Sequence, residues 1–522
     1  MTACPFLNRP TSSPEIFTEG TEHLWQLSPK ATLVWRDSPT GEALHLRERS
    51  CEGLDPARVT VIRWQDKPSM PVVTEEQMEI LRDCGYPSIL PFSHPRDKAR
   101  GTLLCADADI EAQFLRLPRR AEYPSNPIDD LRSLRLADDF GLHFSALNMH
   151  LDDEQAVDRS TRDFVKGEAY REMLEDFIPE ADGLLHARSA KGKPVDTLEL
   201  MMELNSRFAA KMLGIEAIPQ TFSHAFNILL GPSIQLQRQA KCYLNGKAKD
   251  DVSLWERIQD WLANVVHLCR MLYRYKKTFQ RDIKPALLAH ATATLKNYDP
   301  SIPPLNLLEA YIHDGVVDAL MASRDPMLMQ AARTQCQELG ISMEQKILSD
   351  LSLMALVAII ENMAITMTHA LHYLAVDASG TLTPAHAIDK ALKHLSSAGE
   401  LRELRTDAEL VLREGDAATI YPLKEGDAIS FPTMLIRERS RQVETEQQGY
   451  LFGGIPGRHP AACPGRVGAH AYLRRMLTHI QDHYTLSAKS RPEDHVHLCI
   501  MTVRPWPAIE MTFTRKESAE ST

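Results

Sequence analysis

The sequence has few basic residues relative to acidic ones, no paired cysteine motif and no long basic run. Asp and Glu outnumber Lys and Arg by 70 to 59, which gives a formal net charge of −11. Phosphate affinity comes mainly from clustered Lys and Arg, so this balance argues against a nucleic-acid-binding protein. The nine cysteines are scattered without a CxxC pair, which is typical of reduced thiols and not of a disulfide framework or a structural zinc site.

Motifs of several other protein classes are also missing. The longest strongly apolar stretch, residues 351–360, is too short to span a bilayer and is interrupted by Glu361 and Asn362. The first residues lack a charged region followed by an apolar run, so we expect no signal peptide, no membrane span and a cytoplasmic protein. The sequence contains no Walker-type phosphate loop, no GxGxxG after a strand, no HExxH and no GxSxG.

The spacing of apolar residues predicts a mainly α fold with minor β structure. We expect helices over 74–84, 153–178, 194–213, 251–286, 306–321, 325–338, 343–375, 384–405 and 466–484. We expect strands over 32–37, 57–64, 408–415, 418–423 and 427–435, and a strand pair over 495–516 that is split at Pro505–Pro507. The segment 343–375 lacks Gly and Pro and is apolar nearly all round at its centre, so this helix should run through the middle of the core.

The most informative segment is the glycine- and proline-rich stretch that ends at Cys463. Pro464 suits the first position of the helix that follows, because its missing N–H costs nothing there. Cys463 would then lie just before a helix N-terminus, where free backbone N–H groups and the helix dipole favour a thiolate. Gly465 would allow a flat partner to approach closely. Arg458 and His459 would suit as counter-charges for carboxylates of such a partner.

Two plainer interpretations remain open at this point. Cys463 could be a buried cysteine in a turn, because Gly and Pro commonly mark turns before helices. His495, His497 and Cys499 alternate and would share one face of a strand, where they could bind zinc. No fourth zinc ligand is evident, and alternation is also the ordinary pattern of a strand.

The segment resembles the haem-binding loop of the cytochromes P450, whose pattern is Phe-x-x-Gly-x-(Arg/His)-x-Cys-x-Gly. The residues of matching type, in the matching order, are Phe452, Gly457, His459, Cys463 and Gly465. The loop is longer than the pattern and looks like GRH-A-CPG with two residues inserted. Members of the family that rearrange lipid hydroperoxides also carry enlarged loops. The resemblance implies haem b (iron protoporphyrin IX) with Cys463 as its axial thiolate ligand.

The resemblance also implies a fold. It is a single, triangular, mainly helical prism over residues 1–522, with haem between the central helix and the helix that begins near Cys463. Within this prism, 1–150 would form N-terminal strands and gating loops, and 150–405 the helical body. Residues 406–522 would form late strands, the cysteine loop and the C-terminal helix.

In this family a helix crosses the distal face of the haem with the pattern Ala-Gly-x-(Asp/Glu)-Thr-Thr and a Leu- and Ala-rich continuation. Aligning that continuation with 368–375 places residues 358–363 on the pattern. Glu361 then matches the acidic residue, and Asn362 takes the place of the threonine that takes part in proton delivery. The resemblance implies that Glu361 and Asn362 are the catalytic residues that handle protons. The alternative is that both residues cap, bond to neighbours or face solvent.

Two arginines match family positions that hold the haem propionates, namely Arg162 on the helix 153–178 and Arg413 in the strand 408–415. With Arg458 and His459 they form the implied cofactor-binding set, because guanidinium groups suit carboxylates geometrically. Surface arginines are the alternative.

The family's Glu-x-x-Arg ion pair is expected at 400 and 403, but both positions are Glu in this chain. Arg402 or Arg405 would substitute only with a shift of register. The literal match nearby is Glu438 with Arg441, later than the family places it.

Three functions follow as hypotheses. The first is a monooxygenase that oxidises a small lipophilic substrate, within specialised metabolism, with electrons from a separate ferredoxin or flavoprotein reductase. The second is a peroxygenase or hydroperoxide isomerase, which needs no electron donor and which the missing threonine and the enlarged loop favour. The third is a catalytically inactive P450-like auxiliary protein, which the altered ion-pair motif favours and the retained cysteine opposes.

Overall fold

The computed structural model describes residues 16–19, 22–36, 51–94, 97–114, 128–129, 142–144, 151–189, 192–215, 233–246, 254–394, 400–442, 463–499 and 503–516. The chain divides into two compact units. The first, here the β unit, comprises Met1–Met70, Asp83–Arg135 and Glu400–Cys463, and the second, here the helical unit, comprises Pro71–Arg82, Leu136–Gly399 and Pro464–Thr522. Each unit is described by itself, and the expected single domain over 1–522 stays a prediction.

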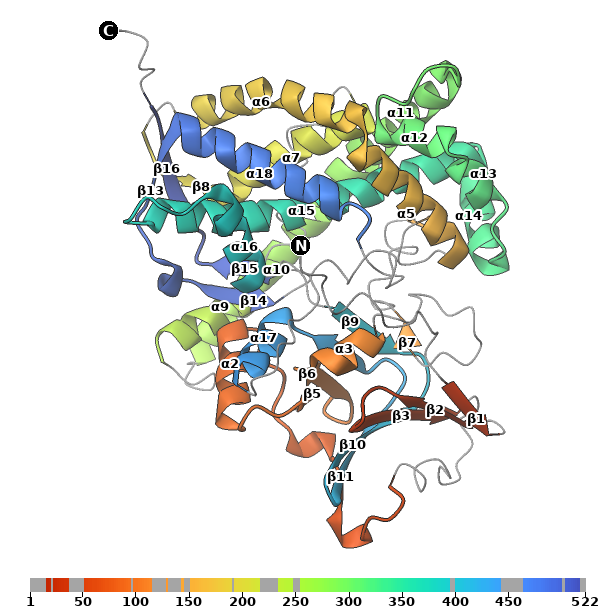
Figure 1. Ribbon diagram of the computed structural model, residues 1–522, viewed down its shortest axis with the longest axis vertical. Coiled ribbons are helices and arrows are strands. Elements are labelled where there is room, and N and C mark those ends of the chain that lie inside the picture. Colours follow the sequence, from red (N-terminus) through yellow and green to blue (C-terminus); the bar gives the residue numbers. More distant parts are fainter. Residues whose placement is uncertain are drawn as a thin grey trace, which may run out of the picture. The chain divides into compact units, whose positions relative to one another are not determined.

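The β unit contains two sheets built from strands far apart in the sequence (Figure 1). The six-stranded sheet has the order β1 (Ile16–Glu19), β2 (Glu22–Gln26), β3 (Ala31–Arg36), β10 (Ala408–Glu414), β11 (Ala417–Leu423) and β4 (Val59–Val61). The five-stranded sheet has the order β5 (Ile89–Ser93), β6 (Gly101–Cys105), β12 (Ala428–Phe431), β9 (Glu400–Leu404) and β7 (Ile128–Asp129). Late strands therefore complete both sheets by pairing with early ones, as β10 does with β3 in antiparallel register.

Aromatic side chains fill the core of the β unit. Trp25 lies 5.2 Å from Phe114, and Phe114 lies 4.9 Å from Phe431, measured between ring centroids. The indole of Trp64 donates a hydrogen bond of 2.6 Å to the carbonyl of Pro422. A Cβ at Gly101 would lie 2.4 Å from the Trp64 ring, so only glycine allows β6 to pass this side chain.

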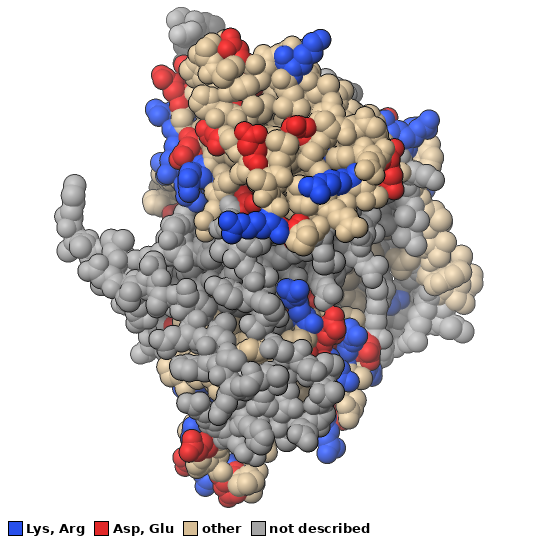
Figure 2. All heavy atoms as spheres, turned by 90° about the vertical axis from the view of Figure 1, so that its right-hand side faces the viewer, with Lys and Arg blue, Asp and Glu red and all other residues tan. Residues whose placement is uncertain are grey.

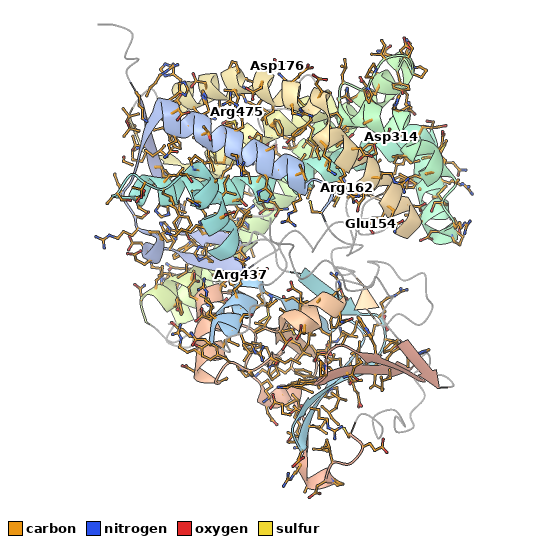
Figure 3. The ribbon with its side chains drawn as sticks, viewed as in Figure 1. Glu154, Arg162, Asp176, Asp314, Arg437 and Arg475 are labelled. Carbon is orange, nitrogen blue, oxygen red and sulfur yellow. The ribbon has the colours of Figure 1, made fainter. Side chains whose placement is uncertain are left out.

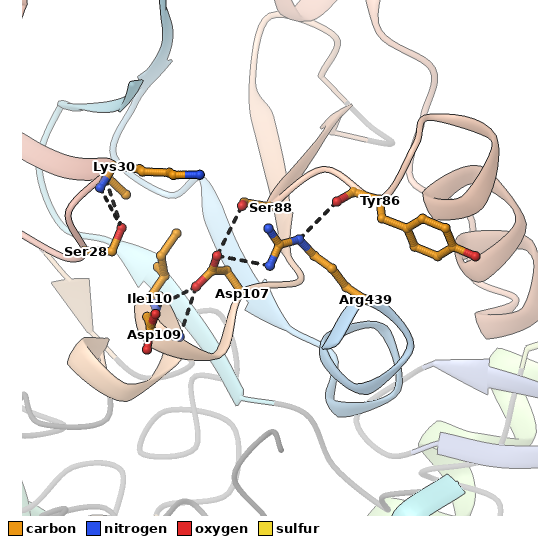
Figure 4. Close-up of polar contacts among 9 residues, drawn as sticks. Ser28, Lys30, Tyr86, Ser88, Asp107, Asp109, Ile110 and Arg439 are labelled. Carbon is orange, nitrogen blue, oxygen red and sulfur yellow. Dashed lines mark hydrogen bonds and ion pairs between the residues drawn. The ribbon is translucent and has the colours of Figure 1, made fainter. Parts of the chain in front are cut away.

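Two short helices of the β unit are joined by a polar network around Asp107 (Figure 4). Asp107 precedes α3 (Ala108–Phe114), and its Oδ1 accepts hydrogen bonds from two backbone N–H groups of that helix. Its Oδ2 accepts from Ser88 at 3.1 Å and from Arg439 of α17 (Thr433–Gln442) at 3.3 Å. Arg439 also donates to the carbonyl of Tyr86 at 3.0 Å. This network holds the last turn of α17 through Arg439. The expected strand 427–435 is wrong in its second half, because β12 ends at Phe431 and α17 begins at Thr433.

The helical unit holds most of the helices in the described part of the chain (Figure 1). In chain order they are α2 (Thr74–Asp83), α5 (Leu151–Lys166), α6 (Glu168–Ser189), α7 (Thr197–Leu213), α9 (Ile234–Leu244), α10 (Leu254–Arg274), a π-helix η5 (Tyr275–Ile283), α11 (Lys284–Asn297), α12 (Leu307–His313), α13 (Val316–Met321), α14 (Pro326–Leu339), α15 (Met343–Val376), α16 (Pro384–His394) and α18 (Arg466–His483). Two small sheets accompany them, in the orders β13 (Tyr484–Ala488), β16 (Glu510–Arg515), β8 (Val195–Asp196) and β14 (Val496–Cys499), β15 (Val503–Trp506).

Helix α15 is the centre of the helical unit, as the sequence predicts. It begins with a capping box between Ser342 and Gln345 and packs against α7, α11 and α16. By length and composition alone this helix could cross a membrane. However, 67% of its most apolar window is buried within the protein, which is how the core helix of a water-soluble fold is packed.

The helices predicted from apolar spacing are present, with four differences. The expected helix 153–178 is divided at Gly167 into α5 and α6, and the expected helix 306–321 is divided at Gly315, whose φ of 71° does not fit a right-handed helix. The expected helix 251–286 is divided into α10, the π-helix η5 and the start of α11. The expected helix 384–405 is wrong in its second half, because α16 ends at His394 and residues 400–404 form strand β9.

Candidate functional site

Cys463 lies directly before helix α18, as predicted. It is a reduced thiol, partly buried, and a two-residue turn separates it from Arg466. Gly465 is the N-cap residue of α18, but no side chain caps this helix and no acidic residue lies in its first turn. The first backbone N–H groups of a helix have no partner within the helix, and they carry the positive end of its dipole. The end of α18 next to Cys463 therefore has the electrostatics that stabilise a thiolate.

The first turn of α18 is held in place by a close helix–helix contact. A Cβ at Gly468 would lie 2.8 Å from the Cβ of Val165 on α5 and 3.2 Å from the ring of Tyr170 on α6. Tyr170 also donates a hydrogen bond of 2.8 Å to the carbonyl of Gly468. Burial raises the pKa of the Tyr170 hydroxyl, so it stays a neutral donor. The position of the cysteine-bearing end of α18 thus depends on a glycine at 468.

A buried hydrogen-bond chain joins α18 to the central helix. The hydroxyl of Tyr472 donates to the Oδ1 of Asn205 on α7 at 2.8 Å, and the Nδ2 of Asn205 donates to the carbonyl of Ile360 on α15 at 3.1 Å. Both polar side chains are fully buried, where an unpaired amide or hydroxyl would be costly. The chain therefore fixes α18 relative to the turn of α15 that carries Glu361 and Asn362.

One face of α15 is uncovered near its middle, although the helix is buried on both sides of that stretch. We call this stretch the α15 window. Its residues are Met354, Ala355, Ala358, Ile359 and Asn362, of which Ala358 is exposed and the others are half-buried. Positions three and four apart lie on the same side of a helix, so the window covers about two turns of one face. Its lining is apolar and small at the centre, as in sites that receive a flat apolar ligand.

Glu361 lies beside the window and is held by an ion pair. Its Oε1 accepts from the Nε of Arg504 on β15 at 2.6 Å and lies 2.5 Å from the Nη2 of the same guanidinium. The two side chains are only 4% and 3% exposed. The interpretation that Glu361 bonds to a neighbour therefore has a specific partner, and its role in proton delivery stays a prediction.

Asn362 is the polar residue of the window. Its side-chain amide donates to the carbonyl of Ala358, one turn earlier, at 3.3 Å. Its Oδ1 is buried and has no hydrogen-bond partner among the described residues. One acceptor is therefore left for a group that lies against the window, since buried polar atoms in proteins are normally satisfied.

Arg162 lies on α5, one turn before the Val165 that contacts α18, and Figure 3 shows it near the beginning of α18. It is half-buried, and its Nε is a buried donor without a hydrogen-bond partner in the part of the chain that the structure describes. A buried guanidinium nitrogen without an acceptor is costly, and a carboxylate would satisfy it. The structure thus brings Arg162 toward the same helix end that Cys463 precedes.

The other sequence-predicted anion-binding residues do not gather in the same way. Arg413 is exposed at the end of β10 and donates to the backbone carbonyl of Glu52 at 3.1 Å, which is a surface role. Arg402, which a shift of register would place in the ion-pair motif, is buried on β9 of the five-stranded sheet. Arg458 and His459 lie outside the described residues.

The expected Glu-x-x-Arg region lies on strand β9, so residues three apart there cannot pair as they do on a helix. The literal match of Glu438 with Arg441 does lie on a helix, α17, where the two side chains are 3.8 Å apart. That helix follows the strands, as the order of the sequence already indicated.

Two of the three proposed zinc ligands are used in other contacts, and the side chain of Cys499 lies outside the described ones. His495 contacts the carbonyl of Pro507 at 2.8 Å and the hydroxyl of Ser490 at 2.7 Å, and His497 is hydrogen-bonded to Glu75 of α2. Among the described residues, no group of three His, Cys, Asp or Glu side chains has a geometry that could hold a metal ion.

Several residues of this region were not anticipated. Asn205 and Arg504 are polar side chains within buried elements, and Gly468 lies inside a helix. The sequence did contain a signal for Asn205, because it is a polar residue within the apolar stretch of α7 and a buried polar residue needs a hydrogen-bond partner. The partner itself could not be found, since it lies 155 positions away in the sequence.

Solved structures provide a comparison for this arrangement. The chain is similar to a cytochrome P450, CYP102L1, with 14% identity and a TM-score of 0.52 over 85% of this chain and 98% of that one. It is similar to P450 OxyD, which is involved in the biosynthesis of vancomycin-type antibiotics, with 14% identity and a TM-score of 0.50 over 89% and 100%. It is also similar to CYP108D1 from Novosphingobium aromaticivorans, with 12% identity and a TM-score of 0.51 over 84% and 94%.

The chain has the cytochrome P450 fold. This confirms the mainly helical class with minor sheets and the fold that the cysteine segment suggested. No family model and no curated protein matches the sequence. At identities this low the likeness concerns the fold, so the chemistry of the P450-like site is argued from the residues.

Proposed function

We propose that this chain is a haem-thiolate monooxygenase that oxidises a small lipophilic substrate. One observation carries the proposal. Within a P450 fold, the chain keeps a reduced cysteine directly before an uncapped helix, and that helix is tied to an uncovered face of the central helix. A structural cysteine would need none of these features.

The residues fit haem b as the cofactor. Cys463 would ligate the iron as a thiolate, and the free N–H groups of α18 would lower the energy of that anion. Bound haem would supply oxygen activation, and an axial thiolate donates electron density that favours cleavage of the O–O bond. Ala355 and Ala358 would let the macrocycle approach α15, because a methyl group is the only side chain in the way.

The propionates would be held by arginine. Arg162 is the candidate that the described residues favour, because its Nε lacks an acceptor. Arg458 and His459, together with Arg413, remain proposals from the resemblance.

A lipophilic substrate follows from the lining of the α15 window, which offers Met354, Ile359 and the two alanines as contacts. Asn362 is its polar group and would orient a substrate or a water molecule through its unpaired Oδ1. Electrons would come from a separate ferredoxin or flavoprotein reductase. A cytoplasmic location and a role in specialised metabolism complete the proposal.

A second candidate is a peroxygenase or hydroperoxide isomerase with the same cofactor. Arg504 holds Glu361 in a buried ion pair, and Asn362 donates one of its two amide N–H groups to the backbone of its own helix. An amide does not release a proton near neutral pH, so neither group is poised to pass protons to the window. A reaction that begins from a hydroperoxide already contains the reduced oxygen and needs no such delivery after electron transfer.

The decisive experiment is the absorption spectrum of the full-length protein reduced under carbon monoxide, for the wild type and Cys463→Ser. We expect the wild type to bind haem and to show the strongly red-shifted band of a thiolate ligand, and Cys463→Ser to lose that band. Cys84→Ser, at an exposed thiol, is the matched control and should retain it. Arg162→Gln should retain the band but lose haem more readily on gel filtration.

The outcomes separate the alternatives. Turnover with a reductase and NADPH supports the monooxygenase, whereas turnover only with hydrogen peroxide or a lipid hydroperoxide supports the second candidate. A wild-type protein that cannot be loaded with haem, or a red-shifted band that survives Cys463→Ser, refutes the proposal and leaves the auxiliary-protein hypothesis.

A further inference from the structure

Helix α10 presents its apolar side to solvent. Seven large apolar side chains along it are at least 40% exposed: Trp255 (65%), Ile258 (41%), Trp261 (63%), Leu262 (52%), Val265 (40%), Val266 (48%) and Tyr273 (63%). We call them the α10 apolar face. Contiguous apolar surfaces of this kind on a folded protein mark sites of interaction.

The periodicity of α10 shows that this exposure is systematic. The exposed apolar residues recur at three- and four-residue spacing, so they lie on one side of the helix. The less exposed described side chains, Ala263, Asn264 and His267, lie on the opposite side, which is the polar one. A helix of a water-soluble protein normally buries its apolar side, so α10 has the reverse orientation.

Basic residues outnumber acidic ones along this segment. Residues 254–283, which form α10 and η5, contain six Lys and Arg and three Asp and Glu, in a chain whose net charge is −11. The acidic residues are Glu256, Asp260 and Asp282, and five of the six cations follow position 269. The ammonium of Lys277 lies 5.7 Å from the ring centroid of exposed Tyr273, at the end of the apolar face. By contrast, acidic and basic side chains are interspersed on the face of the helical unit shown in Figure 2.

We propose that the α10 apolar face binds to the surface of an anionic lipid bilayer, with α10 lying in the plane of the interface. An interfacial helix needs a wide apolar side with aromatic residues and neighbouring Lys and Arg for the headgroups, and α10 has all of these. Trp and Tyr favour the boundary between hydrocarbon and headgroups. The cations near the end of α10 complement the negative surface potential of such a membrane.

The composition of the segment favours a lipid surface over a second copy of this chain. Residues 254–283 carry more basic than acidic residues, so two copies joined along this helix would bring like charges together, whereas anionic headgroups complement them.

The test is co-sedimentation of the full-length protein with vesicles of phosphatidylcholine, with and without phosphatidylserine. We expect binding to the phosphatidylserine vesicles that weakens as salt is added. Trp255→Ser/Trp261→Ser should lower the partition coefficient at least about tenfold. The matched control is Ile302→Ser/Leu305→Ser, which removes two equally exposed apolar side chains outside α10 and should bind as the wild type does.

A charge variant, Arg270→Gln/Arg274→Gln, should reduce binding to phosphatidylserine vesicles and flatten its salt dependence. The substituted side chains at 255, 261, 270, 302 and 305 are exposed, so the unfolding temperatures of the tryptophan variant and its control should be unchanged. The proposal is overturned if the wild type does not sediment with phosphatidylserine vesicles, or if the control variant loses as much binding as the tryptophan variant. It is also overturned if analytical ultracentrifugation shows a dimer that the tryptophan variant dissociates, because a second copy would then be the occupant.

Discussion

The buried ion pair between Glu361 and Arg504 allows the structural and catalytic roles of Glu361 to be separated. The carboxylate and the guanidinium are 4% and 3% exposed, and they join the middle of α15 to β15. We consider three changes: Arg504→Met, Glu361→Gln and the double replacement Glu361→Leu/Arg504→Met. The first removes the cation, the second removes the negative charge but keeps an acceptor, and the third removes both charges.

The expected costs follow from burial. Arg504→Met leaves a carboxylate buried without its cation, and breaking a buried pair in this way costs about 3–5 kcal/mol. Glu361→Gln keeps an acceptor for the guanidinium, so the loss should be smaller, about 1–3 kcal/mol. The double replacement leaves no unpaired charge, and apolar substitutes for buried pairs are often neutral, so it should recover stability to within about 1–2 kcal/mol of the wild type.

The assay is the free energy of unfolding in urea for each variant. Arg188→Met is the matched control, because its ion pair with Glu203 involves an arginine that is 57% exposed. Such a pair contributes less than about 1 kcal/mol. Activity of the haem-loaded protein, with the reductase or with peroxide, is measured on the same samples.

A stable double variant with wild-type activity would establish that Glu361 holds the helix and does not deliver protons. A stable double variant that loses reductase-driven turnover and retains peroxide-driven turnover would establish the catalytic role implied by the resemblance. A double variant as unstable as Arg504→Met would refute the electrostatic reasoning, because then the loss arises from packing and not from an unpaired charge.

Two further predictions concern the same unit. Gly468→Ala should destabilise the protein by about 1–3 kcal/mol and loosen haem binding, because the new Cβ would lie 2.8 Å from that of Val165. The control is Gly183→Ala in α6, where nothing lies within 4 Å of the new Cβ, and this change should stabilise the protein. Equal urea midpoints for both variants would contradict the packing argument. Burial and the neighbouring His497, His372 and His495 hold the pKa of His369 well below 6.5. As pH falls, the unfolded chain therefore protonates this histidine before the folded chain does, so the free energy of unfolding should fall below about pH 6.5. His369→Leu should make this fall shallower by up to about 1.4 kcal/mol per pH unit. An unchanged dependence of the unfolding free energy on pH would show that His369 is not the group responsible.

The helices that could be predicted are those with a continuous apolar period. The central helix was expected over 343–375 and lies at Met343–Val376, because nothing in it interrupts the pattern and its burial agrees with its composition. The predicted helix bounds were wrong where a single residue, such as Gly167, interrupts a helix. They were also wrong in 384–405, where the apolar residues fit the period of a strand as well as that of a helix. Short apolar runs fit a strand as well as a helix, and β9 forms because β12 and β7 pair with it.

The candidate site was predictable only in its local part. The position of Cys463 directly before a helix could be predicted from its neighbours, because proline and glycine determine the backbone conformation at their own positions. The groups that hold the two helices, Tyr472 and Asn205, act across 267 positions of sequence, and no local pattern carries that information. Glu361 stands out in the sequence as a polar break in an apolar helix, and its catalytic role stays a prediction. Its partner in the buried ion pair, Arg504, is 143 positions away, so the sequence could not indicate it.

The hydrogen bonds around the α15 window point to one remaining question about the chemistry. Glu361 is engaged by Arg504, whereas Asn362 uses one of its two amide N–H donors on the carbonyl of Ala358 and keeps the other donor and the buried acceptor Oδ1. An amide can orient a hydroxyl, a hydroperoxide or a water molecule, but it does not release a proton near neutral pH. If the Glu361 variants leave turnover unchanged, a proton that reaches the window must travel on the bound molecule or on water. The choice between the two candidate functions then depends on which of these binds at Asn362.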